Sequence, residues 1–206
     1  MADIKLNFIN RSNERDNTKI VLFQKAESTG YSELPLAWLV IERCGMNARH
    51  PFTYPMTMQV TTRDSWGNYQ EPLNAQPGQA FSLSTTASGD TLELSGKAGY
   101  PDEVDVCNNL SAGSIDAVIF KAGKPLAQKS SIVPADKASF KFLPKLWIGA
   151  VSQIVEGEVM DSAVVDQLNT KFDLTGIASA DIVMTGGGAG PNASPYVFQL
   201  ENVVTL

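Results

Sequence analysis

The sequence predicts an all-β protein made of two antiparallel β-sandwich repeats, immunoglobulin-like or jelly-roll-like, with little helix. Three observations lead to this prediction. Apolar and polar residues alternate over most of the chain, which is the period of half-buried strands. The 16 glycines and 11 prolines fall mostly between these runs, where turns are expected. A segment in the middle of the chain resembles one near its end, which indicates an internal duplication.

The expected strands can be followed along the chain. Ile4, Leu6 and Phe8 alternate with polar residues, and residues 20–23 and 38–41 are apolar runs rich in β-prone side chains. Further strands are expected at 56–62, 81–83, 92–94, 104–107, 115–121, 126–133, 139–143, 146–152, 168–175, 181–185 and 196–204. Many short strands separated by turns are typical of β-sandwiches.

Two local signals complete the expected secondary structure. The turn Ser88-Gly89-Asp90 lies between two alternating runs and predicts a β-hairpin. The helix candidate at 157–167 is short and contains two adjacent valines, so we expect no more than a short turn of helix there.

The prediction of a duplication rests on an ungapped match. Residues 81–99 and 172–190 align at a constant offset of 91, and eight of the nineteen positions are identical. This alignment predicts that Phe81 and Phe172 occupy equivalent buried sites. Weaker matches lie upstream in the same order, although they need gaps.

The spacing of the matches predicts one repeat over residues 1–100 and a second over residues 101–206. This is about the size of an immunoglobulin-like sandwich. The junction at Gly99-Tyr100-Pro101 has no flexible linker, so we expect the repeats to pack closely together. Two tandem sandwiches and one larger sandwich with pseudo-twofold halves both fit this pattern.

Composition and charge exclude several function classes. The net charge is −6, and residues 64–120 carry eight acidic residues and one base. Nucleic-acid binding is not expected, because it requires clustered lysine and arginine. There is no apolar run of roughly 18 residues, as a membrane-spanning helix needs, and residues 1–10 lack the apolar core of a signal peptide. We expect a soluble protein that is cytoplasmic, or released without a classical signal peptide.

The residue patterns predict no catalytic residue, no metal site and no cofactor. His50 is the one histidine of the chain, and no nucleophile-elbow sequence G-x-S-x-G occurs. Cys44 and Cys107 form neither a C-x-x-C motif nor a Cys/His cluster, so free thiols are expected. The glycine-rich segment 186–190 lacks the Lys-Ser/Thr pair of a phosphate-binding loop, and we expect a turn there.

Two groups of acidic residues need separate treatment. Asp102, Glu103 and Asp105 are close in sequence but do not match the spacing of an EF-hand calcium loop. Asp64 and Glu71 flank an aromatic hairpin, and paired carboxylates of this kind carry glycoside hydrolysis. An Asp/Glu-dependent hydrolase therefore remains as the second alternative function.

The strongest binding candidate is a cluster of aromatic and polar residues in turn-like segments. It comprises His50, Tyr54, Trp66, Asn68 and Tyr69. Flat aromatic side chains with polar edges stack on sugar rings, enter membrane interfaces and dominate protein interfaces. The alternative role for these aromatics is to close the end of a sandwich core.

Taken together, the patterns predict a non-enzymatic soluble protein that acts by binding or by self-assembly. The first alternative is a lectin-like or toxin-like module that binds carbohydrate or a membrane surface. A homo-oligomer is expected as well, because the strand at 196–204 contains one charged residue, Glu201, and no proline. Edge strands with so little charge are open to pairing, although the same strand can also close its own sheet.

Overall fold

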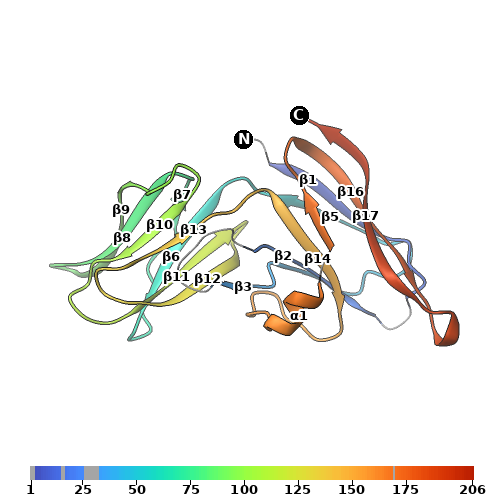
Figure 1. Cartoon of the computed structure of the whole chain (residues 1–206), viewed down its shortest axis with the longest axis horizontal. Coiled ribbons are helices and arrows are strands. Elements are labelled where there is room, and N and C mark those ends of the chain that lie inside the picture. Colours follow the sequence, from blue (N-terminus) through green and yellow to red (C-terminus); the bar gives the residue numbers. More distant parts are fainter. Residues whose placement is uncertain (1–2, 15–16, 26–32, 169) are drawn as a thin grey trace. The chain divides into compact units, whose positions relative to one another are not determined.

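The computed structural model describes residues 3–14, 17–25, 33–168 and 170–206. Within these ranges the chain forms seventeen strands, one short α-helix and one 3-10 turn, which confirms the all-β prediction (Figure 1). The chain divides into two compact units, each assembled from separate segments. Unit 1 comprises residues 1–23, 37–56 and 144–206, and unit 2 comprises residues 24–36 and 57–143.

Unit 1 contains two four-stranded sheets, with strand orders β17-β16-β1-β5 and β15-β14-β2-β4. Its elements are β1 (Ile4–Asn10), β2 (Lys19–Phe23), β4 (Leu39–Ile41), β5 (Arg49–Tyr54), β14 (Lys145–Val151), α1 (Ser162–Gln167), β15 (Thr170–Asp173), β16 (Ile177–Gly187), η1 (Gly190–Asn192) and β17 (Ser194–Thr205). Strands β16 and β17 form the long hairpin drawn in orange and red in Figure 1. Trp38, just before β4, packs edge-on against Tyr54 of β5 and so links the two sheets; the ring centroids are 5.7 Å apart.

Alternation dictates which side chains of β1 enter the core of unit 1. Ile4, Leu6 and Phe8 are buried, whereas Lys5 between them is exposed. Successive side chains of a strand point to opposite faces of its sheet, so one apolar face of β1 is buried. The predicted strand is confirmed here, and it extends to Asn10.

The short turn of helix expected within residues 157–167 is confirmed as α1, which has six residues. It begins after Asp161, whose side chain caps the first turn. The preceding residues are not helical because Gly157 has a φ of 84° and donates a backbone hydrogen bond to Ala37. The segment before the helix is therefore tied to the strand-forming part of unit 1.

Unit 2 contains a four-stranded sheet, β13-β10-β8-β9, and a five-stranded sheet, β3-β12-β11-β6-β7. Its strands are β3 (Glu33–Pro35), β6 (Met58–Asp64), β7 (Leu73–Ala75), β8 (Gln79–Thr86), β9 (Gly89–Lys97), β10 (Val104–Asn108), β11 (Ile115–Lys121), β12 (Lys124–Ile132) and β13 (Lys137–Phe140). The hairpin predicted around Ser88 is confirmed as β8–β9. Strands β3, β5 and β7 were not predicted, because two have only three residues and β5 contains a proline.

The two units use the same order of strands. In the first sheets, β17-β16-β1-β5 corresponds to β9-β8-β10-β13, and the pairs β16–β1 and β8–β10 are both parallel. In the second sheets, β15-β14-β2-β4 corresponds to β7-β6-β11-β12, and every pair is antiparallel. Unit 1 thus combines β1, β2, β4 and β5 from the start of the chain with β14 to β17 from its end. Unit 2 combines β6 to β9 with β10 to β13, and β3 adds a fifth strand to its second sheet.

A buried asparagine ends the corresponding strand in each unit. Asn10 ends β1, Asn108 ends β10, and neither side chain is exposed. The Asn10 Oδ1 atom accepts a hydrogen bond from the Ser12 N–H (2.9 Å), as the Asn108 Oδ1 atom does from the Leu110 N–H (3.1 Å). Both Nδ2 groups donate to backbone carbonyls, of Cys44 for Asn10 and of Gly113 and Ile132 for Asn108. The same side-chain turn therefore fixes both strand ends.

Three sequence expectations need correction or comment. The sheets are not purely antiparallel, because strands far apart in the chain have no hairpin to impose that direction. The compact units are not the contiguous halves 1–100 and 101–206, since residues on both sides of position 100 belong to unit 2. Whether those halves are repeats, packed as sandwiches, stays a prediction.

The match at offset 91 does not align corresponding strands. It places Phe81 of β8 opposite Phe172 of β15, and both residues are buried. Strand β8, however, lies inside its sheet between β9 and β10, whereas β15 is an edge strand beside β14. The prediction that these two phenylalanines are equivalent is therefore wrong, and the match reflects shared strand and turn composition.

Candidate functional site

The connection between β6 and β7 carries the most exposed tryptophan of the described residues. Trp66 is 71% exposed, and its backbone is held by Asp64. The Asp64 Oδ1 atom accepts hydrogen bonds from the N–H groups of Trp66 (2.9 Å) and Asn68 (2.8 Å), and Oδ2 accepts from Asn68 Nδ2 (2.8 Å). Gly67 has a φ of 89°, which the turn requires. The indole is thus displayed to solvent from a tightly bonded turn.

The pKa of the Asp64 carboxyl is consistent with this role. Burial of the group raises its pKa, but hydrogen bonds from Asn68, Trp66 and Gly67 outweigh that effect and hold it below its ordinary value. The carboxylate is therefore ionised at neutral pH and acts as the anchor of the turn. Its oxygens are occupied in the way expected of a structural acid.

Arg63 and Asp116 form an ion pair beside the turn, on the neighbouring strands β6 and β11. The Asp116 carboxylate also accepts hydrogen bonds from the Ser131 N–H (3.0 Å) and from Gln128 Nε2 (3.4 Å). The Arg63 guanidinium lies 5.8 Å from the ring centroid of Tyr69, within the range of a cation–π contact. The hydrogen bond to Asp116 raises the already high pKa of Arg63, so the guanidinium stays charged.

The turn and the ion pair border an open concavity whose volume is about 650 Å³ and which lies entirely within unit 2. It is lined by Arg63, Asp64, Ser65, Trp66, Gly67, Ser114, Asp116, Ser130 and Ser131. Trp66 forms its largest apolar wall, and serine hydroxyls and the ion pair supply its polar groups. A side chain added at Gly113 would lie 3.6 Å from the indole, so the tryptophan ring rests beside that glycine.

The structure separates the predicted binding residues into two groups. Trp66, Asn68 and Tyr69 lie together at the β6–β7 turn of unit 2, and Tyr69 is 65% exposed. His50 and Tyr54 lie on β5 of unit 1. Tyr54 is fully buried against Trp38, so it is a core residue and not part of a binding surface. His50 is half-buried and pairs with Phe8 across the sheet.

Sequence reasoning missed most of the polar side of this surface. Arg63 is adjacent to the aromatic turn and could have been included on that ground. Asp116, Ser130 and Ser131 are 50 or more positions further along the chain, and only the pairing of β11 with β6 and β12 brings them there. No signal in the sequence specifies that pairing.

The corresponding place in unit 1 is covered. Residues 152–168 follow β14 as the 65–72 segment follows β6, and they are tied down by backbone hydrogen bonds between Ala37 and residues 157 and 158. Met160 and Val165 of this segment are buried in a cluster with Val21 and Phe23. Lys19, the first residue of β2, donates a hydrogen bond to the Ile154 carbonyl of this covering segment (3.0 Å).

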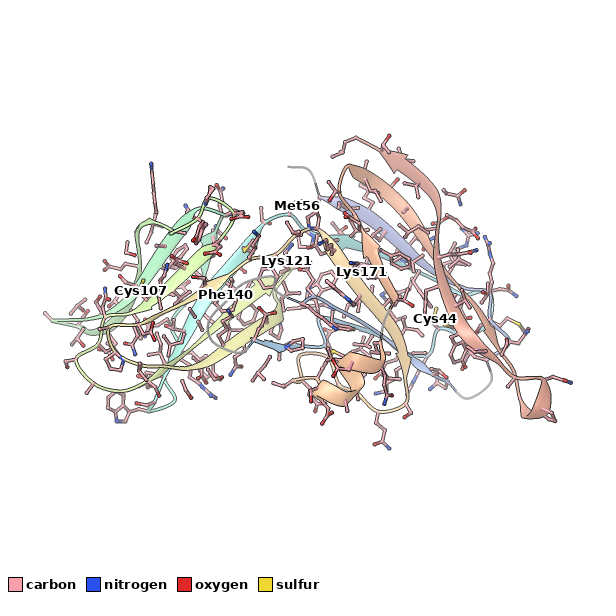
Figure 2. The ribbon with its side chains drawn as sticks, viewed as in Figure 1. Cys44, Met56, Cys107, Lys121, Phe140 and Lys171 are labelled. Atoms are coloured by element: carbon pink, nitrogen blue, oxygen red, sulfur yellow. The ribbon has the colours of Figure 1, made fainter. Side chains whose placement is uncertain are left out.

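The other residues singled out in the sequence lie in contacts that explain them by packing. Cys44 and Cys107 are unpaired, half-buried and in different units, and burial raises the pKa of both thiols (Figure 2). At Gly186, an added side chain would lie 2.1 Å from the Pro195 carbonyl oxygen, so close approach of β17 explains that glycine. Trp147 is half-buried against Phe23, and the Nζ atom of Lys171, which is labelled in Figure 2, lies 5.9 Å from the centroid of its ring.

Two of the three acidic residues in the segment 102–105 form ion pairs. Asp105 is buried and accepts hydrogen bonds from Lys137 Nζ (2.6 Å), Ser139 Oγ (2.6 Å) and the Gly99 N–H (2.9 Å). Asp102 pairs with Lys141. Among the described residues, no three His, Cys, Asp or Glu side chains are grouped as a metal site requires.

No protein-family model, curated protein or solved structure matches this chain. Within the part of the chain that the structure describes, no helix is long and apolar enough to cross a membrane.

Proposed function

We propose that this protein is a non-catalytic binding protein and that the concave surface beside Trp66 binds a saccharide. The observation that carries the proposal is the 71% exposure of Trp66 on a turn held by the buried Asp64. A large aromatic side chain in solvent has no role in the core of its unit. The hydrogen bonds that fix its position reduce the conformational cost of stacking a ligand on it.

The polar groups favour a neutral sugar over an anionic one. The charge of Arg63 is offset by Asp116, and the ionised Asp64 leaves the lining with one net negative charge, which disfavours an anionic ligand. Serine hydroxyls line the same concavity. Orientation by a few polar groups beside an apolar wall is the usual arrangement of a small-molecule site.

Charge argues against membrane binding, and the hydrogen bonds of Asp64 argue against a hydrolase. A membrane with anionic lipids would be repelled by the segment 64–120, which carries eight acids and one base. A hydrolase using Asp64 would need a free carboxylate, whereas this carboxylate accepts three hydrogen bonds from its own turn. Both functions remain alternatives, and assays with vesicles and with glycosides separate them.

A second inference concerns the origin of the fold. We infer that residues 1–100 and 101–206 are repeats of one β-sandwich whose halves have been exchanged within the chain. The identical strand order of the two units and the matching turns at Asn10 and Asn108 support this. Corresponding residues in these turns are 98 positions apart, so the spacing fits repeats of about 100 residues. Exchange of identical elements between two chains is a low-cost route to dimers, and here the exchange would be between two repeats of one chain.

The experiment is a glycan-array screen followed by calorimetric titration of the best neutral saccharide. We expect Trp66→Ala to weaken binding about tenfold or more, as loss of a central aromatic contact does. Tyr100→Ala is the matched control, because Tyr100 is 65% exposed in the same unit and lies outside the concavity. Equal loss in both variants, or no saccharide bound by the wild type, would contradict the proposal.

A parallel assay separates the alternatives. Sedimentation with vesicles of neutral and of anionic lipid should recover no protein. Vesicle binding that is lost in Trp66→Ala would favour the membrane alternative instead. Release of free sugar from a bound glycoside, abolished by Asp64→Asn while binding is retained, would favour the hydrolase.

A further inference from the structure

Strand β17 is the longest edge strand in the part of the chain that the structure describes, and it carries a single charged residue. It is at the edge of the sheet β17-β16-β1-β5 and has 12 residues. Its only charged residue is Glu201, which forms an ion pair with Arg11 (2.8 Å). Val197, Val203 and Val204 of this strand are 45–55% exposed. An edge of this kind has backbone groups on one side that no strand of its own sheet uses.

Several other edges carry charge or proline inside the strand, whereas the one proline of β17, Pro195, is at its second position and outside the segment 197–201. Strand β5, at the opposite edge of the same sheet, has Pro51 in its interior, and proline cannot donate to a further strand. Strand β9, the corresponding edge in unit 2, carries Asp90, Glu93 and Lys97. Strand β13 begins with Lys137. Charge and proline at an edge are the usual means of preventing unwanted pairing.

We propose that β17 pairs with β17 of a second copy of this chain, antiparallel and about a twofold axis at Gln199. The segment Val197–Glu201 is the part of β17 in unbroken register with β16, from Thr185 to Asp181. Gln199 is its midpoint. A twofold pairing joins identical surfaces, so the interface closes at a dimer.

The side chains of this segment suit such a pairing. About a twofold axis at Gln199, Phe198 lies opposite Leu200 of the second copy, and both residues are half-buried in one chain. Apolar cross-strand pairs stabilise a sheet and would be covered further by the dimer. Glu201 lies opposite Val197 of the second copy, so like charges do not meet directly. A protein with a net charge of −6 can associate at this edge because the edge itself is close to neutral.

The test uses analytical ultracentrifugation of the full chain at micromolar concentration. The wild type should sediment at about twice its mass of 22.2 kDa. Gln199→Glu keeps the size of the side chain and places two carboxylates opposite each other. The dissociation constant of the dimer should therefore rise about five- to tenfold, and high salt should restore the wild-type value. Leu94→Glu is the control, because Leu94 is 56% exposed on the β9 edge, and it should leave the dimer unchanged.

A cross-linking variant identifies the register. In a chain with Cys44→Ser and Cys107→Ser, the change Gln199→Cys should give a disulfide-linked dimer on mild oxidation, because opposite side chains at the axis are close enough to bridge. Leu94→Cys in the same background should not. A monomeric wild type would overturn the proposal, as would a dimer that Gln199→Glu does not weaken or that Gln199→Cys does not cross-link.

Discussion

The two units share a strand order and differ in the connection after one pair of corresponding strands. After β14 in unit 1, residues 152–168 fold back and bury Met160 and Val165 against the core. After β6 in unit 2, the turn at Trp66 stays in solvent and leaves a concavity of about 650 Å³ beside it. The same framework is thus closed in one unit and open in the other.

The difference between the two units indicates which features serve the framework and which are candidates for a function. A feature present in both units, such as the asparagine turn at Asn10 and Asn108, is explained by the needs of the framework. A feature present in one unit needs another reason. The exposed Trp66 and the Arg63–Asp116 pair belong to this second class, because in unit 1 the segment after β14 folds back over the core and is hydrogen-bonded by Lys19.

The sharpest test of the comparison is the stability cost of truncating each connection. Met160→Ala removes a side chain that is 4% exposed in the unit 1 cluster and should cost about 2–4 kcal/mol. Trp66→Ala removes an exposed side chain and should cost less than about 0.5 kcal/mol. Urea denaturation measures both. Similar costs would mean that the β6–β7 turn closes a core as residues 152–168 do.

The shared framework predicts equal effects at the two buried asparagines. Asn10→Ala and Asn108→Ala each leave buried backbone groups without a partner, and each should cost about 2 kcal/mol. The measurement is again the free energy of unfolding. A large cost at one site with none at the other would show that the corresponding turns do not have corresponding roles.

Acid should affect one unit through a residue that the other lacks. Burial raises the pKa of Asp105, but hydrogen bonds from Lys137, Ser139 and Gly99 outweigh it, so the pKa is below the ordinary 3.8. Asn7 occupies the corresponding strand position in unit 1 and does not titrate. The ionised Asp105 therefore stabilises unit 2 above pH 3.8, and this contribution is lost as the pH falls through the lower native pKa.

The matching variant is Asp105→Asn. At neutral pH it should reduce stability by about 1–2 kcal/mol, since hydrogen bonds to a charged group are lost. The difference between wild type and variant should shrink as the pH falls from about 7 to about 2. A difference that stays constant over this range would show that the Asp105 charge does not contribute.

Local patterns were sufficient to predict most strands and the all-β class. Alternation in β1 and the turn at Ser88 are local signals, and both are confirmed. The partners of each strand were not predictable. Nothing in the sequence of β1 indicates that it pairs in parallel with the distant strand β16, because side-chain alternation defines a buried face but not a neighbour.

The candidate site shows the same limit. Trp66, Asn68 and Tyr69 are close in sequence and were found together, whereas Asp116 and Ser131 reach the surface only through the pairing of β11 with β6 and β12. Tyr54 was misplaced because its segment, with two prolines, resembles a loop. In the structure the segment is an edge strand that tolerates Pro51, and its last residue is buried.

The most direct test of the central claim is a nuclear magnetic resonance titration that observes the indole N–H signals of the three tryptophans. Trp38 is 2% exposed, Trp147 is half-buried, and Trp66 is in solvent, so the three signals should be distinct and can be assigned with Trp66→Phe. Saturating the protein with the neutral saccharide selected on the array should shift the Trp66 signal and leave Trp38 and Trp147 unchanged. A saccharide that binds without moving the Trp66 signal would contradict the assignment of this surface as the binding site.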